Sequence, residues 1–334
     1  MTIRDIAREA GVSASSVSRV INGKPGVNPQ SRAKVMALLD QYGYESPREQ
    51  REALSGAGRL VGILVADVRT VHLTEGAYHI SQSLSEYGYT SIIQNTGNSD
   101  EKRAAAIRNL KRQRVCAIVL MGSQFESQAI GAVIEQEAPH IPVFMLNGFL
   151  NLPNVCGVLS DERSGVKDCI ALLAGENRRK IAMLVDAPRP SSRLKEEGFA
   201  EGMMQLGHSK GDLWIYRDVD ASLQGGYAAT QKALSDHPDL EGLICSLDII
   251  ACGAIHALVD LQIDIPGQIA VIGIDNSLYA EICLPQLTSL DNMILYSGVT
   301  LAHKLIDCLE GRKPNQRTVL LPSIVTRAST GKRK

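Results

Sequence analysis

Residues 13–22 combine short hydroxyl side chains with a single arginine on one side of a predicted helix. Serine and asparagine side chains can hydrogen-bond to phosphate oxygens, and arginine can bind guanine through two donors at once. The positions outside the predicted buried stripe are Ser13, Ala14, Ser15, Ser16, Ser18, Arg19 and Asn22. Because most of these side chains are small, the helix can fit into a groove, and the set indicates contact with DNA.

Two short helical patterns joined by a glycine turn position these side chains. Apolar residues recur at helical spacing before Gly11, which tolerates the left-handed conformation that closes a last turn. Ser13 follows as an N-cap, and Val17, Val20 and Ile21 form the apolar stripe of the next helix. The spacing predicts a helix-turn-helix with residues 13–21 as the recognition helix. It leaves open an ordinary helical hairpin with a solvated serine face.

A third helix completes a small head, for which we expect the bounds 1–44. Asn28 is placed to cap it, Pro29 occupies its first turn and Gly43 ends it. Residues 45–59 form a polar linker, in which we expect a short helix over 48–54 that ends on an apolar residue, Leu54.

Composition separates this head from the rest of the chain. The 334 residues are enough for two or three domains, and a hydrophobic content of 44% supports a large core. The formal net charge is −1, but residues 1–59 hold nine Lys/Arg and six Asp/Glu, a balance of +3 that leaves −4 elsewhere. A basic head on an acidic body favours binding of nucleic acid by the head alone.

The seven cysteines are odd in number and scattered, without a CxxC pair, so we expect reduced residues in a cytoplasmic, nucleoid-associated protein. The sequence starts directly with a polar helical pattern, and no apolar run has the length of a membrane span, so neither a signal peptide nor membrane contact is expected. The histidines show no ligand spacing, so we expect no metal site. We expect no cofactor either.

Residues 60–334 alternate buried strands with helices, the pattern of a parallel sheet covered on both faces. The predicted strands are 60–67, 89–95, 116–122, 142–148, 180–186, 212–218, 240–246 and 269–275. The predicted helices are 74–87, 100–113, 126–138, 162–174, 191–207, 224–236 and 248–260. The fold class is therefore α/β: an all-α head on a body of two doubly wound lobes, approximately 60–160 plus 290–320, and 161–289.

Polar residues follow many of these strands and would meet at a cleft between the lobes, where such sheets bind ligands. Carboxylates there can bind the hydroxyls of a sugar, polyol or ribose, although any one of them can instead cap a helix. Lys195 is the one well-placed cation, and His72 follows the first strand of the body. Enzyme signatures such as GxSxG, HExxH and the Walker loop are absent, which favours binding over catalysis. The strand-end residues are Asp67, Asn147, Asp161, Asp186, Asp218, Asp248 and Asp275.

The chain resembles the LacI/GalR family of bacterial transcriptional regulators over essentially its whole length. The head segments that carry the resemblance are TIRDIAREAGVSASSVSRVIN and VNPQSRAKVMALLDQYGY. The body segments, in the family's order, are VGILVAD, PVFMLNG, SDERSG, RLKEEGF, LDIIACGAIHAL, IPGQIAVIGIDN, PQLTSL and VTRAST.

The resemblance implies a dimer with two heads on a pseudo-palindromic operator. Ala14, Ser15 and Arg19 would read bases, and Leu54 would enter the minor groove from a hinge helix that forms on DNA. Ser13, Ser16, Ser18 and Asn22 would hold phosphates. The body is similar to periplasmic sugar-binding proteins, and a small effector between its lobes would control operator binding. The residues expected at the effector are His72, Leu73, Asp161, Lys195, Asp248 and Asp275. With no heptad pattern after VTRAST, we expect a dimer and no coiled-coil tetramer.

The sequence departs from the family pattern in the linker and in the cleft. The linker is one residue longer and carries Glu49 and Glu52, which place negative charge near phosphate. Lys195 replaces the usual effector-binding arginine, Leu247 replaces an asparagine, and the aromatic residue that often stacks on the effector is missing near Ala221. We therefore expect a repressor of this family whose effector, a sugar or sugar derivative, is bound in an altered mode. The alternative is a solute-binding or enzymatic α/β protein whose N-terminal helices only pack.

Overall fold

The computed structural model describes residues 3–21, 27–41 and 59–331. The chain divides into two compact units, Met1–Leu60 and Val61–Lys334. The predicted hinge helix over 48–54, with Leu54, lies outside the described residues, as does Asn22. Among the residues that the structure describes, none of the helices combines the length and apolarity that a membrane span needs.

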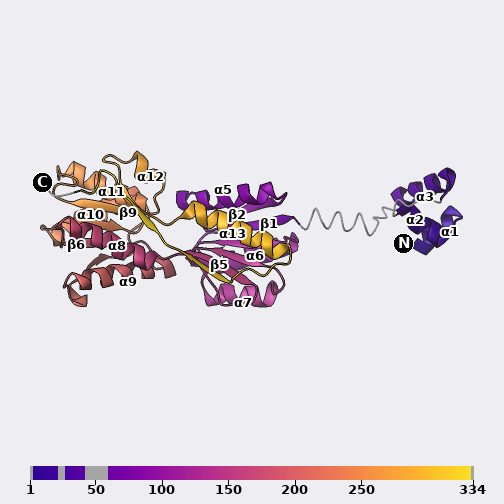
Figure 1. Ribbon diagram of the computed structural model, residues 1–334, viewed down its shortest axis with the longest axis horizontal. Coiled ribbons are helices and arrows are strands. Elements are labelled where there is room, and N and C mark those ends of the chain that lie inside the picture. The colour runs from indigo at the N-terminus through magenta and orange to yellow at the C-terminus, as the bar shows by residue number, and fades with distance from the viewer. Residues whose placement is uncertain (1–2, 22–26, 42–58, 332–334) are drawn as a thin grey trace. The chain divides into compact units, whose positions relative to one another are not determined.

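The head is a three-helix unit made of α1 (Ile3–Ala10), α2 (Ala14–Ile21) and α3 (Pro29–Gln41) (Figure 1). Gly11 turns the chain between α1 and α2 with a φ of +69°, the left-handed conformation expected of it. The Ser31 amide donates to Asn28 Oδ1 at 2.7 Å, so Asn28 caps α3 as predicted. The core of the head is aliphatic, formed by Ile6, Ala7, Ala10, Val17, Val20 and Val35. The predicted apolar stripe of α2 is thus confirmed at Val17 and Val20.

The body holds two six-stranded sheets, one in each lobe. The first has the strand order β11-β5-β4-β3-β1-β2. Its strands are β1 (Leu60–Val65), β2 (Thr90–Asn95), β3 (Ala117–Met121), β4 (Val143–Leu146), β5 (Val155–Ser160) and β11 (Arg317–Leu320). Its helices are α5 (Val71–Glu86), α6 (Asp100–Arg112), the 3-10 turn η1 (Ser123–Phe125), α7 (Gln128–Glu137) and α13 (Ile294–Leu309).

The second sheet has the order β12-β10-β9-β8-β6-β7. Its strands are β6 (Ile181–Leu184), β7 (Trp214–Tyr216), β8 (Gly242–Cys245), β9 (Ala270–Ile274), β10 (Thr288–Asp291) and β12 (Ser323–Val325). Its helices are α8 (Glu162–Gly175), α9 (Pro190–Gln205), the 3-10 turn η2 (Lys210–Asp212), α10 (Leu223–Asp236), α11 (Asp248–Asp260) and α12 (Leu278–Ile282). The fold class is confirmed, with one antiparallel pair, β10 and β12, at the edge of the second sheet.

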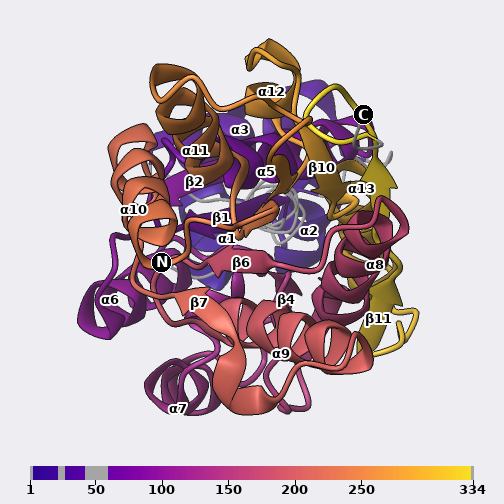
Figure 2. The same ribbon diagram turned by 90° about the vertical axis from the view of Figure 1, so that its left-hand side faces the viewer.

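Helices cover both faces of the second sheet, which explains its continuously apolar strands. In Figure 2, α10 and α11 lie on one side of the sheet and α8 and α9 on the other. Leu243 of β8 packs in the cluster that includes α11, and the next residue, Ile244, packs in the cluster that includes α8 and α9. Successive residues of a strand point to opposite faces, so a strand buried on both faces is apolar throughout.

The chain crosses between the lobes three times, after β5, after β10 and after β11 (Figure 1). The crossing segments bring residues 161–162, 292–293 and 321–322 to the junction of the lobes. A polar cluster is therefore assembled there from segments far apart in the sequence.

Candidate nucleic-acid interface and inter-lobe cleft

The outer face of α2 presents the predicted polar set. The Ser16 amide donates to Ser13 Oγ at 3.2 Å, so Ser13 caps the helix. The Ser13 hydroxyl also lies 2.8 Å from that of Ser15 and 2.9 Å from that of Ser16, which gathers three hydroxyls at the helix start. Ser13, Ala14, Ser15 and Arg19 are exposed, and Ser16 and Ser18 are half-buried. Hydroxyls at a helix N-terminus together with an exposed arginine form a surface that can hold phosphates and bases.

Polar side chains from both lobes line the cleft of the body. An inner chamber of about 80 Å³ is bounded by His72 and Asn147 of the first lobe and by Glu162, Lys195 and Asp275 of the second. A larger cavity of about 800 Å³ adjoins it, sharing Leu73, Ser123 and Arg189 among its lining residues. Typical ligand pockets measure roughly 300–1,000 Å³. The larger cavity therefore suits the body of a ligand, and the chamber suits a single protruding group.

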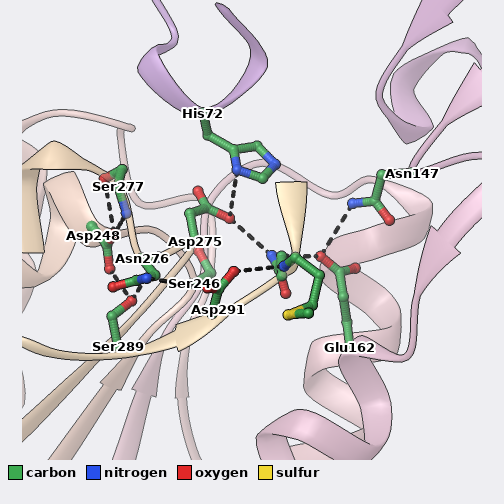
Figure 3. A network of polar contacts seen from close by, with 12 residues as sticks. His72, Asn147, Glu162, Ser246, Asp248, Asp275, Asn276, Ser277, Ser289 and Asp291 are labelled. Carbon is green, nitrogen blue, oxygen red and sulfur yellow. Dashed lines mark hydrogen bonds and ion pairs between the residues drawn. The ribbon is translucent and has the colours of Figure 1, made fainter. Parts of the chain in front are cut away.

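Glu162 is the centre of the polar cluster in the chamber (Figure 3). Its Oε1 lies 3.4 Å from the Lys195 ammonium and accepts hydrogen bonds from the side-chain amides of Asn147 at 3.3 Å and Asn292 at 3.4 Å. Lys195 also donates to the backbone oxygen of Ser246 at 3.0 Å. Burial alone would lower the pKa of Lys195, but Glu162, Asp275 and Asp186 together raise it. Lys195 is therefore a charged, internally paired residue.

His72 and Asp275 face each other across the junction, with 3.7 Å between Nδ1 and Oδ1 (Figure 3). Asp275 also accepts a hydrogen bond from Asn292 at 2.9 Å. Burial raises the pKa of Asp275 to about 7, and burial together with the Lys195 charge lowers the pKa of His72 to about 4. The imidazole is therefore neutral at physiological pH.

Asp248 forms hydrogen bonds within the second lobe. Its carboxylate accepts hydrogen bonds from the Ser277 amide at 2.7 Å, the Ser277 hydroxyl at 2.8 Å and the Ser289 hydroxyl at 2.6 Å (Figure 3). Burial and the neighbouring Asp275 raise its pKa to about 7. These bonds fix the start of α11 to the segment before α12, and Asp248 also lines a cavity of about 410 Å³ together with His72 and Asp275.

Two strand-end aspartates make contacts within the protein, and the expectation about a single cation needs correction. Asp161 accepts a hydrogen bond from the Ser164 amide at 3.2 Å and caps α8, the alternative role weighed for it. Asp67 pairs with Arg69, whose guanidinium holds the pKa of that carboxyl at about 2. Lys195 is not the one well-placed cation, because Arg69, Arg103 and Arg189 also line the large cavity.

Several cleft residues were missed by the sequence reasoning. Glu162, next to the capping Asp161, has a weak signal in the SDERSG segment. Arg189 forms an ion pair with Asp186 at 3.1 Å, and its signal is its place just before Pro190, where α9 begins. Arg103 and Asn292 had no usable signal, because one lies on a charged helix and the other on a crossing segment. Among the described residues, no Phe, Tyr or Trp lines the chamber or the large cavity, but Tyr279 lines an adjoining cavity of about 410 Å³ that shares His72 and Asp275 with the chamber.

Buried polar atoms at the cleft point to a ligand. Within the described part of the chain, His72 Nδ1, Glu162 Oε2 and Arg103 Nε are buried without a hydrogen-bond partner. Leaving such atoms unpaired is costly, commonly about 1–3 kcal/mol each. A polar ligand that enters from the large cavity can satisfy them.

Comparisons with known proteins support the fold of both the head and the body. Residues 2–46 match the model of bacterial regulatory proteins of the lacI family, and residues 170–330 match a periplasmic binding protein-like domain. The chain is 30% identical over 342 residues to the HTH-type transcriptional regulator MalR of Streptomyces coelicolor, covering 99% of this chain and 97% of that one.

Two solved structures share the fold. The lac repressor dimer bound to operator and the anti-inducer ONPF has a TM-score of 0.75 at 22% identity, with 98% of each chain covered. The complex of the transcriptional regulator CelR with cellobiose has a TM-score of 0.70 at 22% identity, covering 99% of this chain and 100% of that one. With a helix-turn-helix head, a two-lobed body and these matches over its full length, the chain belongs to the LacI family and is a DNA-binding transcriptional regulator.

Proposed function

We propose that the chain is a cytoplasmic repressor whose operator affinity is controlled by a sugar or sugar derivative bound between the two lobes. The observation that carries the effector part is the cleft: a cavity of about 800 Å³ that joins a chamber lined by buried polar groups of both lobes. A ligand that bridges two lobes changes how they sit relative to each other, which is the requirement for a switch.

The chemistry of the lining supports a hydroxyl-rich ligand. Carboxylates such as Asp218, Asp220 and Glu126 accept hydrogen bonds from hydroxyls, and Ser123 and Gln124 can both donate and accept. A nucleobase prefers an aromatic stacking surface, and no Phe, Tyr or Trp that the structure describes lines these two cavities. CelR, whose fold this chain shares, is solved with cellobiose. In this proposal the effector-binding set keeps His72, Leu73, Lys195 and Asp275 and gains Glu162.

For the head we propose that Ala14, Ser15 and Arg19 contact bases and that the surrounding hydroxyls contact phosphates. Ser13, Ser16 and Ser18 belong to the phosphate set by position, as does Asn22 by sequence. Residues 1–44 would form the DNA-binding domain, 45–59 the hinge with Leu54 at its end, and 60–334 the effector and dimerisation domain.

We propose a homodimer on a pseudo-palindromic operator. Apolar side chains remain exposed on α5, α12 and α13, among them Tyr78, Leu278, Ile282 and Tyr296. Contiguous exposed apolar surface marks protein interfaces, so we propose these helices as the contact between the two copies.

Selection of bound sequences from a random duplex pool tests the DNA part. The proposal expects an inverted repeat and an affinity that falls steeply between low and moderate salt, since binding releases counterions from the phosphates. If the selection recovers no motif and salt does not change the binding, the alternative is favoured: a solute-binding or enzymatic α/β protein whose N-terminal helices only pack.

Calorimetry with a panel of sugars, phosphosugars and nucleosides tests the effector part. The proposal expects binding confined to sugars or phosphosugars, with an accompanying change in duplex affinity. Binding of nucleosides alone, or of nothing in the panel, contradicts it. A sugar that binds and raises duplex affinity would support the effector site but show that the sugar strengthens DNA binding instead of weakening it.

A further inference from the structure

Two cysteines of the second lobe converge on one backbone atom. Cys252 lies in α11, and its Sγ contacts the Tyr279 carbonyl oxygen at 3.5 Å. Cys283 follows α12 directly, and its amide donates to the same oxygen at 3.2 Å. α11 and α12 lie side by side in both views of the molecule (Figures 1 and 2). The shared acceptor brings the two cysteines into one neighbourhood, which is the first condition for a disulfide, whose Cα atoms must lie within about 7 Å of each other.

The pair is buried but close to solvent. Cys252 is 5% exposed and Cys283 is 6% exposed, whereas Cys169 and Cys245 are fully buried at 0%. Ile282 and Leu284, on either side of Cys283, are 61% and 79% exposed. A small opening of this segment therefore exposes the Cys283 sulfur, because local openings of surface segments cost far less than global unfolding.

The two thiols differ in reactivity. The side chains of Cys252 and Cys283 interact, and this interaction lowers the pKa of Cys283 and raises that of Cys252. Burial raises the pKa of Cys169 and Cys245. The thiolate is the nucleophile in cysteine chemistry, so Cys283 is the attacking sulfur and Cys252 the resolving one.

We propose that Cys252 and Cys283 form a reversible intrachain disulfide on exposure to a hydroperoxide. The Cys283 thiolate attacks the peroxide, the O–O bond breaks, and the sulfur becomes a sulfenic acid while an alcohol or water leaves. The Cys252 sulfur then attacks the Cys283 sulfur; the S–S bond forms, the S–O bond breaks and water leaves. In balance, two thiols and one hydroperoxide give one disulfide, one alcohol and one water. A dithiol reverses the step by exchange.

The disulfide would fix both ends of α12 to α11. The start of α12 is already held, because Ser277 donates two hydrogen bonds to Asp248 in the first turn of α11. The end would be held by the new bond at Cys252, one turn further along α11. Between these points α12 carries the exposed Leu278 and Ile282. The residues before Ser277 include Asp275 of the cleft, so oxidation would stiffen a segment shared by the cleft and the apolar surface.

Mass mapping of the intact, full-length chain tests the proposal. After hydrogen peroxide and alkylation of free thiols, digestion should give a Cys252–Cys283 crosslinked peptide that lacks two hydrogen atoms, and dithiothreitol should restore two alkylatable thiols. The chain should stay monomeric in mass on a non-reducing gel. A covalent dimer, or sulfinic acid at Cys283 with Cys252 still alkylatable, overturns the proposal.

Matched variants test whether Cys252 and Cys283 react specifically as a pair or whether cysteines react only according to their exposure. Cys252→Ser should remove the crosslink and leave a sulfenic acid at Cys283, detectable by a dimedone adduct. Cys283→Ser should remove both, and Cys245→Ser should change neither. In the reduced protein, Cys283 should alkylate at least about tenfold faster than Cys169, because its thiolate is more populated and closer to solvent. Equal rates at the two positions would contradict the inference, and they are measurable on the unmodified sequence even where a serine variant folds poorly.

Discussion

The Lys195 ammonium lies 3.4 Å from the Glu162 carboxylate, and the two side chains are only 5% and 1% exposed. Both come from the second lobe, but Glu162 is also bound by Asn147 of the first. The cation that the sequence offers as a free ligand contact is therefore already paired, and its partner lies at the junction between the lobes. An effector that reaches the chamber must exchange contacts with this pair.

Breaking this pair should destabilise the body strongly. Lys195→Met leaves Glu162 buried without its cation, and we expect the free energy of unfolding to fall by about 3–5 kcal/mol. Glu162→Gln should cost less, since a neutral amide keeps the bonds to the asparagines. The double variant should lose clearly less than the two single losses combined, because the two residues interact. Urea unfolding of all four proteins measures this coupling, and strict additivity would show that the pair is not coupled.

The body should become more stable as pH falls from 8 towards 5. Burial raises the pKa of Asp248 and Asp275 to about 7, so these carboxyls stabilise the fold below their unfolded pKa, and the gain is lost as pH rises through 7. Each contributes up to about 1.4 kcal/mol per pH unit between its unfolded pKa, near 4, and its folded pKa, near 7, and nothing above that range. The pKa of His72 is lowered to about 4, so its neutral form makes the body less stable as pH falls below 6.5. This loss offsets the stability gained from one of the two carboxyls.

Urea unfolding at pH 5 and pH 8 measures this slope. Asp248→Asn cannot titrate, so most of the net slope between pH 5 and pH 7 should disappear, because His72 offsets the remaining Asp275 over most of that range. Identical slopes in the two proteins would show that Asp248 is ionised throughout this range.

Arg103 should contribute to effector binding through the large cavity. Its guanidinium pairs with Asp100 at 2.9 Å, while its Nε is buried without a partner. Arg103→Met should weaken the effector found by calorimetry by at least about tenfold, the cost of one charge-assisted hydrogen bond. Arg108→Met is the matched control, because Arg108 lies on the same helix and pairs with Glu137 on the surface. An equal loss in both variants would mean that α6 acts on folding and not on the site.

Arg19 should determine selectivity at one base pair. Arg19→Ala should reduce the preference for guanine at that position by about 1–3 kcal/mol. Arg19→Lys keeps the charge but loses the two-donor fork, so it should retain general duplex affinity and lose most of the selectivity. Affinities for operator variants changed one base pair at a time give the answer. A uniform loss over all of them would identify Arg19 as a phosphate contact.

Gly253 should be intolerant of a side chain, because α10 and α11 touch backbone to backbone. A Cβ at Gly253 would lie 2.1 Å from the Leu223 carbonyl oxygen, so one helix would have to move. We expect Gly253→Ala to destabilise the body by at least about 1–3 kcal/mol in urea unfolding. Gly175→Ala is the control: nothing lies within 4 Å of its added Cβ, and the better helix propensity of alanine should leave stability equal or higher.

The sequence by itself determined the local structure of the head and most of the body. Gly11, Ser13 and the stripe of Val17 and Val20 predict α2 to within one residue, because caps and helical periodicity are local. The strands between residues 60 and 275 were predicted for the same reason, with the exception of β5. Gly157 and Cys156 weaken the strand pattern of β5, and Gly157 is needed there because a Cβ would lie 2.6 Å from the Gly148 oxygen.

Only the tertiary structure decided which polar residues share a site. Strand-end position predicts a place at the cleft but does not separate a ligand contact from a cap, as Asp161 shows by capping its own helix. Glu162, one residue later, meets Asn147 and Asn292 only because two crossing segments and the end of β4 come together. Burial, pairing and the pKa values that follow from them depend on neighbours distant in sequence, and no local pattern in a single chain encodes those neighbours.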